Sequence, residues 1–324
     1  MDTNLARLEI VTPLEAESFA DCLLSGLRKT PKEIACKYFY DEAGSRLFDA
    51  ICELPEYYQT RTEVALLRRH AIEIAALMGP GIEIVEFGAG SLRKVRILLD
   101  AAQKPRAYTP LDISGDYLQG VVHALAADYP ALHLRPLVGD FTLPLEIPAL
   151  SGQELNKSRR AGFFPGSTIG NFKPDAAMAL LRRMRASLNG GGLLIGVDLV
   201  KDPLRLHAAY NDAAGVTALF NKNLLARANR ELGADFDLDG FAHYAPYNPA
   251  AHRIEMYLVS LRRQSVNLCG QRFDFAAGEP VHTEDSHKYT IESFREMACR
   301  AGFNPRAVWT DEARLFSVHW LESR

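Results

Sequence analysis

The sequence lacks several features that would place it in a common functional class. Its five cysteines are scattered over 324 residues without a C-x-x-C pair, which argues against a disulfide framework and a cysteine zinc site. No apolar run approaches the roughly 18 residues of a membrane-spanning helix. The nine histidines form no H-E-x-x-H cluster and no G-x-S-x-G elbow is present, so neither a metal site nor a hydrolase is expected.

An excess of charge of one sign is also missing. The formal net charge is -3, with 24% charged and 48% hydrophobic residues, as in ordinary globular proteins. Without a basic excess, nucleic acid is not an expected partner. The first residues, 1–4, are not a basic segment followed by an apolar stretch, so no signal peptide is expected. Reduced, scattered thiols then predict a cytoplasmic protein without a membrane partner.

What the sequence does contain is a glycine turn between a strand and a helix. The apolar run Ile82–Phe87 is typical of a buried parallel strand, and a helix is expected from Leu92 to Ala102. Gly88 and Gly90 allow a tight turn and close approach of a ligand to the backbone. The free N–H groups at the helix start favour a polar or anionic ligand group.

Three further residues define the type of turn. Ser91 is a candidate cap for the helix, and Arg93 stands where the dinucleotide fingerprint has its third glycine. Glu86 precedes the first glycine, so the turn reads E-x-G-x-G. This pattern resembles motif I of S-adenosylmethionine-dependent methyltransferases. A turn without any ligand remains the alternative at this point.

Acidic residues follow the next two predicted strands. Asp112 ends the strand Ala107–Leu111, about twenty residues past the glycine turn, where an acidic side chain can accept hydrogen bonds from ribose hydroxyls. Asp140 follows the strand Leu132–Val138, and with the next backbone N–H it is placed to read an adenine edge. Each aspartate taken alone is equally well explained as a cap or turn residue.

The strand and helix alternation continues and is then interrupted. Residues 163–172 form a predicted strand that ends in a polar turn, where Asn171 can meet a ligand or serve as a turn residue. Residues 142–160 are expected to be irregular, and residues 201–286 form an insertion too long for a loop. The remaining predicted elements are the helices 13–28, 115–127, 212–232 and 291–301, a helix opened by Lys173-Pro174, and the strands 193–200, 253–261, 271–275, 281–286, 306–310 and 315–321.

The N-terminal region is rich in aromatic residues. Residues 37–58 contain six tyrosines and phenylalanines, a density typical of core packing but also of pockets for amines. Thr60 and Glu63 match a capping box that would open a helix reaching Met78. We expect two domains, a doubly wound α/β sheet from 61–200 with 287–324, and a smaller α+β lobe from 1–60 with 201–286 that covers the cofactor edge.

These segments together resemble the histidine-specific Nα-methyltransferases of ergothioneine biosynthesis, which make hercynine. The resemblance covers nearly the whole chain, and its motifs are residues 37–58, 166–171, 210–217, 253–256 and 309–321. It implies a Rossmann-like methyltransferase sheet with a last antiparallel strand, together with a substrate-binding lobe. The turn Gly88-Ala89-Gly90 differs from the family's usual Gly-Ser-Gly.

The same resemblance implies a role for each of a set of residues. It assigns S-adenosylmethionine binding to Gly88, Lys94, Asp112, Asp140 and Phe141, and no metal. It assigns the substrate carboxylate to Asn171 and Tyr210 with Gly166 nearby, the amine and ring pocket to Tyr40, Phe48 and Tyr57, and the imidazole to Glu284 and Ser286 beside Met256. Tyr40 is the candidate catalytic residue, as the group that orients the amine.

The resemblance therefore predicts trimethylation of the α-amino group of L-histidine, with S-adenosyl-L-homocysteine as the second product. One alternative is the same chemistry on another amino acid, such as tryptophan or a derivative, because relatives use the scaffold in this way. Glu284 and Ser286 favour histidine, since an indole offers one donor and no acceptor. Another alternative is a non-catalytic binder of S-adenosylmethionine or of a nicotinamide. The expected partner is a small-molecule amino acid, and the chain is expected to be a monomer.

Overall fold

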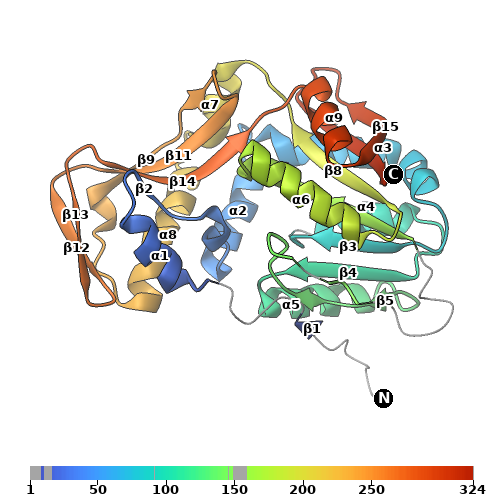
Figure 1. Cartoon of the computed structure of the whole chain (residues 1–324), viewed down its shortest axis with the longest axis horizontal. Coiled ribbons are helices and arrows are strands. Elements are labelled where there is room, and N and C mark those ends of the chain that lie inside the picture. The colour runs from blue at the N-terminus through green and yellow to red at the C-terminus, as the bar shows by residue number, and fades with distance from the viewer. Residues whose placement is uncertain (1–8, 11–16, 91, 145, 149–158, 324) are drawn as a thin grey trace. The chain divides into compact units, whose positions relative to one another are not determined.

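The computed structural model describes residues 9–10, 17–90, 92–144, 146–148 and 159–323, which form two compact units (Figure 1). The first unit takes Arg61–Leu199 and Tyr289–Arg324 together with strand β1 (Glu9–Ile10), and the second takes Glu17–Thr60 and Val200–Lys288. The predicted helix cap Ser91 lies outside the described residues. Assigning all of residues 1–60 to the second lobe is wrong for β1, because this strand pairs in parallel with β6 of the first unit.

The first unit is a doubly wound α/β sheet. Its elements after β1 are α3 (Tyr58–Met78), β3 (Glu83–Phe87), α4 (Leu92–Ala101), β4 (Ala107–Asp112), α5 (Gly115–Ala126), β5 (His133–Leu134), β6 (Leu137–Val138), β7 (Arg160–Phe164), the 3-10 helix η3 (Thr168–Asn171), α6 (Pro174–Ser187), β8 (Gly192–Asp198), α9 (Ile291–Arg300), β15 (Phe303–Thr310) and β16 (Phe316–Ser323). The strand order is β1-β6-β4-β3-β7-β8-β16-β15, with β5 on β4.

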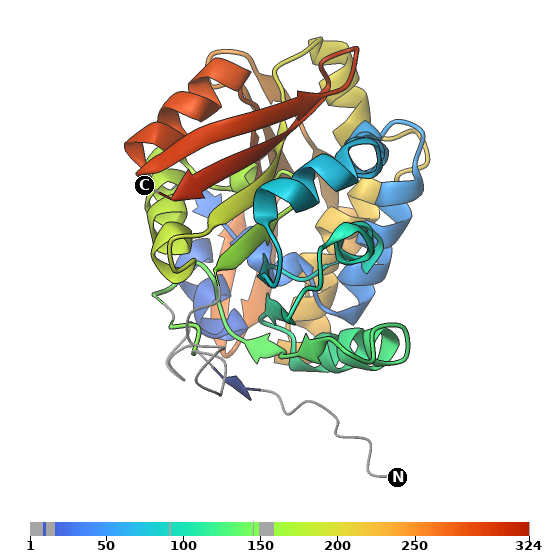
Figure 2. The same ribbon diagram turned by 90° about the vertical axis from the view of Figure 1, so that its right-hand side faces the viewer.

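The direction of the strands confirms the predicted methyltransferase sheet. The neighbours from β1 to β8 pair in parallel, whereas β16 runs antiparallel to β8 and to β15 (Figure 2). In parallel sheets all carboxyl ends lie at one edge, where ligands bind. The antiparallel strand β16 comes last in the chain, as expected.

Both faces of this sheet are covered by helices. Ile84 and Val85 are neighbours in β3 but belong to two different hydrophobic clusters, because successive side chains of a strand point to opposite faces. On one side Leu98 of α4 packs in the cluster of Ile84, together with residues of α3 and α5. On the other side Leu181 of α6 and Phe294 of α9 pack in the cluster of Val85. The core therefore fixes the sheet between two helical layers.

Several sequence predictions for this unit are wrong. The predicted strand 132–138 is split into β5 and β6, because Pro136 has no N–H to donate to a neighbouring strand. The predicted capping box does not open α3, since the helix already begins at Tyr58, and the carboxylate of Glu63 has other partners. Of the region 142–160 predicted to be irregular, residues 142–144 and 146–148 carry no helix or strand, and 149–158 lie outside the described residues. The prediction is wrong at its end, because β7 already begins at Arg160, before the strand start expected at residue 163.

The second unit is an α+β fold. Its elements are α1 (Phe19–Leu27), β2 (Lys32–Glu33), η1 (Cys36–Phe39), α2 (Glu42–Glu53), α7 (Pro203–Tyr210), α8 (Val216–Leu232), η4 (Leu238–Gly240), β9 (Phe241–Tyr244), β10 (Tyr247–Asn248), β11 (Arg253–Ser260), β12 (Gln264–Leu268), β13 (Gln271–Phe275) and β14 (Pro280–His287). One sheet has the order β10-β11-β14-β2 with β9 also on β11, and β12 and β13 form a separate hairpin.

The predicted ends of the strands in this unit are confirmed to within one residue for β11, β13 and β14. The two predicted helices begin later than expected. The helix expected from residue 212 begins at Val216, because the Asp212 carboxylate accepts hydrogen bonds from the backbone N–H groups of Val216 and Thr217 at 2.8 Å and so caps it. The helix expected over 13–28 is confirmed only as α1, and part of the remainder lies outside the described residues. Strands β9, β10 and β12 were not predicted.

Among the described helices, none is long and apolar enough to cross a membrane.

Candidate functional site

The polar residues predicted at strand ends do lie at one edge of the first sheet. Phe87 of β3 pairs with Leu111 of β4, and Asp112 pairs with Val138 of β6, so the three strands end side by side. The Asp112 carboxylate accepts a hydrogen bond from the backbone N–H of Ser114 at 2.8 Å. Burial raises the pKa of Asp112 to about 6. The side chain is therefore a partly desolvated acceptor at the ligand-binding edge.

Gly88 is required by the geometry of this edge. Its φ is +73°, a conformation that side chains disfavour, and a Cβ at this position would lie 3.2 Å from the ring of Phe141. Phe141 in turn contacts the rings of Phe164 and Phe172, with centroids 5.5 and 6.5 Å apart. Asp140, just before it, accepts hydrogen bonds from the backbone N–H and the hydroxyl of Thr142. The strand ends thus carry a glycine turn, an aromatic ring and two carboxylates at the same edge of the sheet.

A buried glutamate connects two of the predicted residues of this unit. The Glu63 carboxylate lies 2.6 Å from the Nζ atom of Lys94 and accepts a hydrogen bond from the backbone N–H of Gly166 at 2.9 Å. Glu63 is 1% exposed and Lys94 9% exposed, so the pair is shielded from solvent. A Cβ at Gly196 of β8 would come within 2.1 Å of the Glu63 Oε1 atom, so the carboxylate lies directly against this strand.

The turn after β7 has an unusual backbone. Gly166 has φ +79° and the next residue, Ser167, has φ +58°, a conformation that is costly for a residue other than glycine. The Ser167 hydroxyl accepts a hydrogen bond from the backbone N–H of Asp198 at 2.8 Å, which holds the turn. The turn leads into η3, which ends at Asn171. Such strain is frequent at ligand sites.

In the second unit the predicted aromatic residues form one cluster. The centroid of the Tyr40 ring lies 5.6 Å from that of Phe48, Phe48 lies 6.2 Å from Tyr57, and Tyr57 lies 6.3 Å from Tyr210. Phe220 of α8, which was not predicted, contacts both Tyr40 and Phe48. Desolvation of the Tyr40 hydroxyl, followed by the nearby charge of Glu284, raises its pKa well above the usual range. The residue as a whole is nevertheless 37% exposed. This phenol therefore stays protonated at neutral pH.

A polar segment of β14 and the residue after it is buried. All six residues from Thr283 to Lys288 have polar or charged side chains, and all are buried. Buried polar groups need partners or a function. Glu284 and Ser286 are two residues apart in this strand and so lie on the same face, and Glu284 pairs in register with Met256 of β11. Burial raises the pKa of Glu284 to about 7, opposed by the charges of Lys288 and His282.

The hydroxyls of Tyr210 and Ser286 belong to a triangle of hydrogen bonds. Their oxygen atoms are 2.7 Å apart, and the Lys288 ammonium donates to Ser286 at 2.7 Å and to Tyr210 at 2.9 Å. Tyr210 and Ser286 were predicted to contact substrate, whereas Lys288 was not singled out. Within the second unit the structure thus brings Tyr40, Phe48, Tyr57 and Tyr210 together in one cluster, and joins Tyr210 to Ser286. Gly166 and Asn171 belong to the first unit.

Comparison of the sequence with known proteins identifies the family of this chain. Residues 19–323 match the family model described as histidine-specific methyltransferase, SAM-dependent. The chain belongs to this family. It is 42% identical over 321 residues to a histidine N-alpha-methyltransferase of Mycolicibacterium smegmatis, covering 96% of this chain and 98% of that protein. The family is S-adenosylmethionine-dependent, which makes the strand-end residues of the first unit candidates for that cofactor.

Two more distant relatives show how far the similarity extends. Ergothioneine biosynthesis protein 1 of Neurospora crassa is 30% identical over 86% of this chain and 32% of its own length. A 4-dimethylallyltryptophan N-methyltransferase of Epichloe festucae var. lolii is 26% identical over 96% of this chain and 95% of its own. The names of these relatives therefore point to more than one substrate. The substrate of this methyltransferase must be argued from the residues of the second unit.

The residues present fit S-adenosylmethionine. Asp112 offers carboxylate oxygens that can accept hydrogen bonds from two ribose hydroxyls, and the missing side chain at Gly88 lets a ligand approach the turn closely. Phe141 presents a ring beside this turn. Among the described residues there is no group of three or more His, Cys, Asp or Glu suited to a metal ion.

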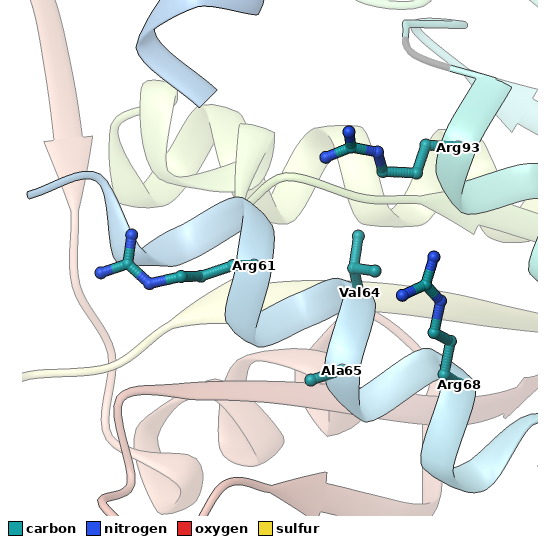
Figure 3. Close-up of a pocket in the computed structure, with 5 residues that line it drawn as sticks. All are labelled: Arg61, Val64, Ala65, Arg68 and Arg93. Atoms are coloured by element: carbon teal, nitrogen blue, oxygen red, sulfur yellow. The ribbon is translucent and has the colours of Figure 1, made fainter. Parts of the chain in front are cut away.

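A hollow of the first unit is lined mainly by basic side chains. A space of about 330 Å³ is lined by Arg61, Val64, Ala65 and Arg68 of α3 and by Arg93 of α4. Figure 3 shows Val64 lying between the side chains of Arg68 and Arg93. None of the predicted site residues, all of which are described, lines this hollow. Its three guanidinium groups make it a basic feature beside the start of α4, the helix that follows the glycine turn.

Proposed function

We propose that this methyltransferase transfers methyl groups to the α-amino group of L-histidine and converts it to the trimethylated betaine, a step of ergothioneine biosynthesis. The observation that carries the proposal is the 42% identity to a histidine N-alpha-methyltransferase over nearly the full length of both chains. The family model, which names histidine as the substrate, supports the same conclusion.

The polar segment of β14 suits an imidazole ring. A neutral imidazole has one N–H donor and one nitrogen acceptor, and its cation has two donors. The Glu284 carboxyl group, with a pKa of about 7, accepts when ionised and donates when protonated. Ser286 offers a hydroxyl two residues further along the same face. In this proposal the two side chains bind the two ring nitrogens, and Met256 packs beside the ring.

The reacting amine requires a different environment. S-adenosylmethionine supplies the methyl group, and S-adenosylhomocysteine is the leaving product. The amine must be neutral to attack, whereas an α-amino group has a reference pKa near 8 and is mostly protonated at pH 7. Each methyl transfer therefore releases one proton, which passes to the solvent. Tyr40 keeps its proton because its pKa is raised, so we assign it the orientation of the amine and not the removal of a proton. The faces of Tyr40 and Phe48 also tolerate a cationic product.

The carboxylate of the substrate is assigned to Asn171 and Tyr210, with Gly166 nearby. An amide N–H₂ and a phenol are donors that suit a carboxylate, which only accepts. Gly88, Lys94, Asp112, Asp140 and Phe141 are assigned to the cofactor. We further propose that the enzyme is a monomer, uses no metal, acts on the free amino acid and works in the cytoplasm. The five cysteines, which are free thiols, support the last point.

A second substrate class is a tryptophan or a related amino acid, as the name of the Epichloe relative suggests. An indole has a single N–H donor and no acceptor, so it could bind only one of Glu284 and Ser286, whereas an imidazole can bind both. Histidine is therefore the substrate that the second unit supports better.

Mass spectrometry of the reaction products tests the proposal. The enzyme is incubated with S-adenosylmethionine and each of the twenty amino acids, and successive methyl additions are counted. We expect three additions on histidine and none of comparable rate on the others. Preferential methylation of tryptophan would replace the substrate, and the absence of any methylated product would refute the enzymatic proposal.

A further inference from the structure

Lys288 is a buried cation placed beside two of the residues that we assign to the substrate. It is 3% exposed, its Nζ atom donates to the hydroxyls of Tyr210 and Ser286, and it lies 4.8 Å from the centroid of the Tyr210 ring. A desolvated ammonium is costly unless it is well paired. Lys288 therefore needs an explanation beyond packing.

The hydrogen bonds of the triangle limit what the two hydroxyls can offer to a ligand. An ammonium is only a donor, so Lys288 gives protons to both hydroxyl oxygens. The third bond, between Tyr210 and Ser286, uses one of the two hydroxyl protons. At most one hydroxyl can therefore donate outside the triangle, whatever other contacts the residues make. The other hydroxyl can then serve a ligand only as an acceptor.

We propose that Lys288 is a positioning residue that makes Tyr210 the outward donor to the substrate carboxylate and leaves Ser286 as an acceptor for a ring N–H. This inference rests on the proposed function, because a carboxylate has no proton to give and needs a donor. Donation from a cation to the Tyr210 oxygen also strengthens the outward O–H donor, since linked hydrogen bonds polarise one another. Lys288 thus acts on the substrate through Tyr210.

The chain contains a matched control for this pair. Lys201 donates to the hydroxyl of Tyr58 at 2.6 Å and lies 4.6 Å from the centroid of its ring, in the same unit. The geometry is nearly the same as that of Lys288 and Tyr210, but neither residue is assigned to the substrate. Removing the Lys201 charge therefore controls for the general loss of a lysine–tyrosine pair.

The experiment compares histidine with histamine, which lacks only the carboxylate. For wild type, Lys288→Met, Lys201→Met, Tyr210→Phe and the double variant Tyr210→Phe/Lys288→Met, kcat and KM are measured for both amines. We expect Lys288→Met to lower the histidine-to-histamine ratio of kcat/KM by about tenfold or more, as for loss of a hydrogen bond to a charged group. The change should appear in the KM for histidine, whereas Lys201→Met should leave the ratio unchanged.

The double variant tests whether Lys288 acts through Tyr210. In the Tyr210→Phe background, Lys288→Met should change the ratio by less than about threefold, because coupled residues are not additive. An equal loss of ratio in both backgrounds would overturn the positioning role. An unchanged ratio in Lys288→Met would overturn the whole inference, while wild-type turnover of histidine would still uphold the proposed function.

Folding of the variants is checked by thermal unfolding and by S-adenosylmethionine affinity. If Lys288→Met does not fold, Lys288→Gln takes its place, because its amide still donates but carries no charge. A loss of ratio is still expected for this variant, because the cation that polarises the Tyr210 hydroxyl is gone, and wild-type behaviour would overturn the role of the charge. If wild type methylates neither amine, the proposed function and this inference fail together.

Discussion

The two units place the residues of the predicted site differently. In the first unit Asp112 and Asp140 follow strand ends, and each carboxylate accepts a hydrogen bond from a backbone N–H. In the second unit the polar residues lie within strand β14, and their partners are other side chains, as in the triangle of Tyr210, Ser286 and Lys288. The first arrangement is general to parallel sheets, whereas the second depends on which side chains this strand and its neighbours carry. Cofactor recognition should therefore tolerate change in the second unit, and substrate recognition should not.

Removing Glu284 is the strongest test of this separation. Glu284→Ala takes away the proposed partner of one ring nitrogen, and a site built to hydrogen-bond a group discriminates strongly when that bond is lost. We expect the KM for histidine to rise by about 10²-fold or more, equivalent to about 2.7 kcal/mol. Discrimination against phenylalanine and tryptophan should weaken. Steady-state kinetics measure both effects.

Two controls accompany this variant. Glu284→Gln keeps the size and one acceptor and should lose less than Glu284→Ala. Calorimetry should show unchanged S-adenosylmethionine affinity, because the proposed cofactor residues belong to the other unit. Equal KM values for wild type and Glu284→Ala would remove Glu284 from the recognition of the ring.

Histamine tests whether the substrate carboxylate is recognised. It keeps the imidazole and the amine but cannot bind the donors of Asn171 and Tyr210. Hydrogen bonds to charged groups contribute about 1.5–3 kcal/mol, so kcat/KM should fall by about 10- to 100-fold relative to histidine. Turnover of histamine at the rate of histidine would show that these two residues do not hold a carboxylate.

The corresponding test in the first unit is Asp112→Ala. The variant leaves two ribose hydroxyls without an acceptor, and we expect S-adenosylmethionine to bind at least about tenfold more weakly. Because the pKa of Asp112 is raised to about 6, wild-type affinity should also fall as the pH drops through this value and the carboxylate becomes protonated. Asp112→Asn should lack this pH dependence. Calorimetric titrations that give the same affinity for wild type and Asp112→Ala would exclude Asp112 from the cofactor site.

The smallest expected effect concerns stability. Glu86 is 2% exposed, accepts a hydrogen bond from the Tyr108 hydroxyl, and has its pKa raised by burial from 4.5 to about 8. Between these values the folded state holds a proton that the unfolded state releases, so the free energy of unfolding should decrease as pH rises. Glu86→Gln keeps the acceptor but has no proton to lose.

Urea unfolding near pH 6 and pH 8 measures this difference. The variant should gain on the order of 1 kcal/mol over wild type at the higher pH and little at the lower one. Glu284, whose pKa is raised to about 7, contributes in the same direction in the second unit. Identical slopes for wild type and Glu86→Gln would mean that Glu86 is ionised in the fold.

The difference between the units also explains what the sequence could predict. Apolar runs that end in Gly88, Asp112 and Asp140 reveal parallel strands and their ligand edge, because strand, turn and polar group are adjacent in the chain. Glu63 was misread as a capping residue, since its partners Lys94 and Gly166 are distant in sequence. Lys288 was missed because its partner Tyr210 is likewise distant in sequence.

The second unit was harder to predict because its contacts arise only on folding. The polar residues 283–288 give no local sign that they are buried, and the short strands β9, β10 and β12 have no long apolar pattern. The resemblance to known methyltransferases supplied the roles of Tyr210, Glu284 and Ser286. It did not supply the hydrogen-bond triangle, which depends on the distances between the side chains.

The contact between Gly196 and Glu63 has a consequence for how this sequence can vary. Glycine to alanine is usually a mild change in a strand, yet a methyl group at position 196 would occupy the place of the Glu63 carboxylate. The displaced carboxylate would lose Lys94 and the backbone of Gly166 as partners. Positions 63 and 196 are thus expected to covary. A natural Gly196→Ala variant adds one carbon to β8 and removes no functional group, yet we expect it to use the cofactor less well.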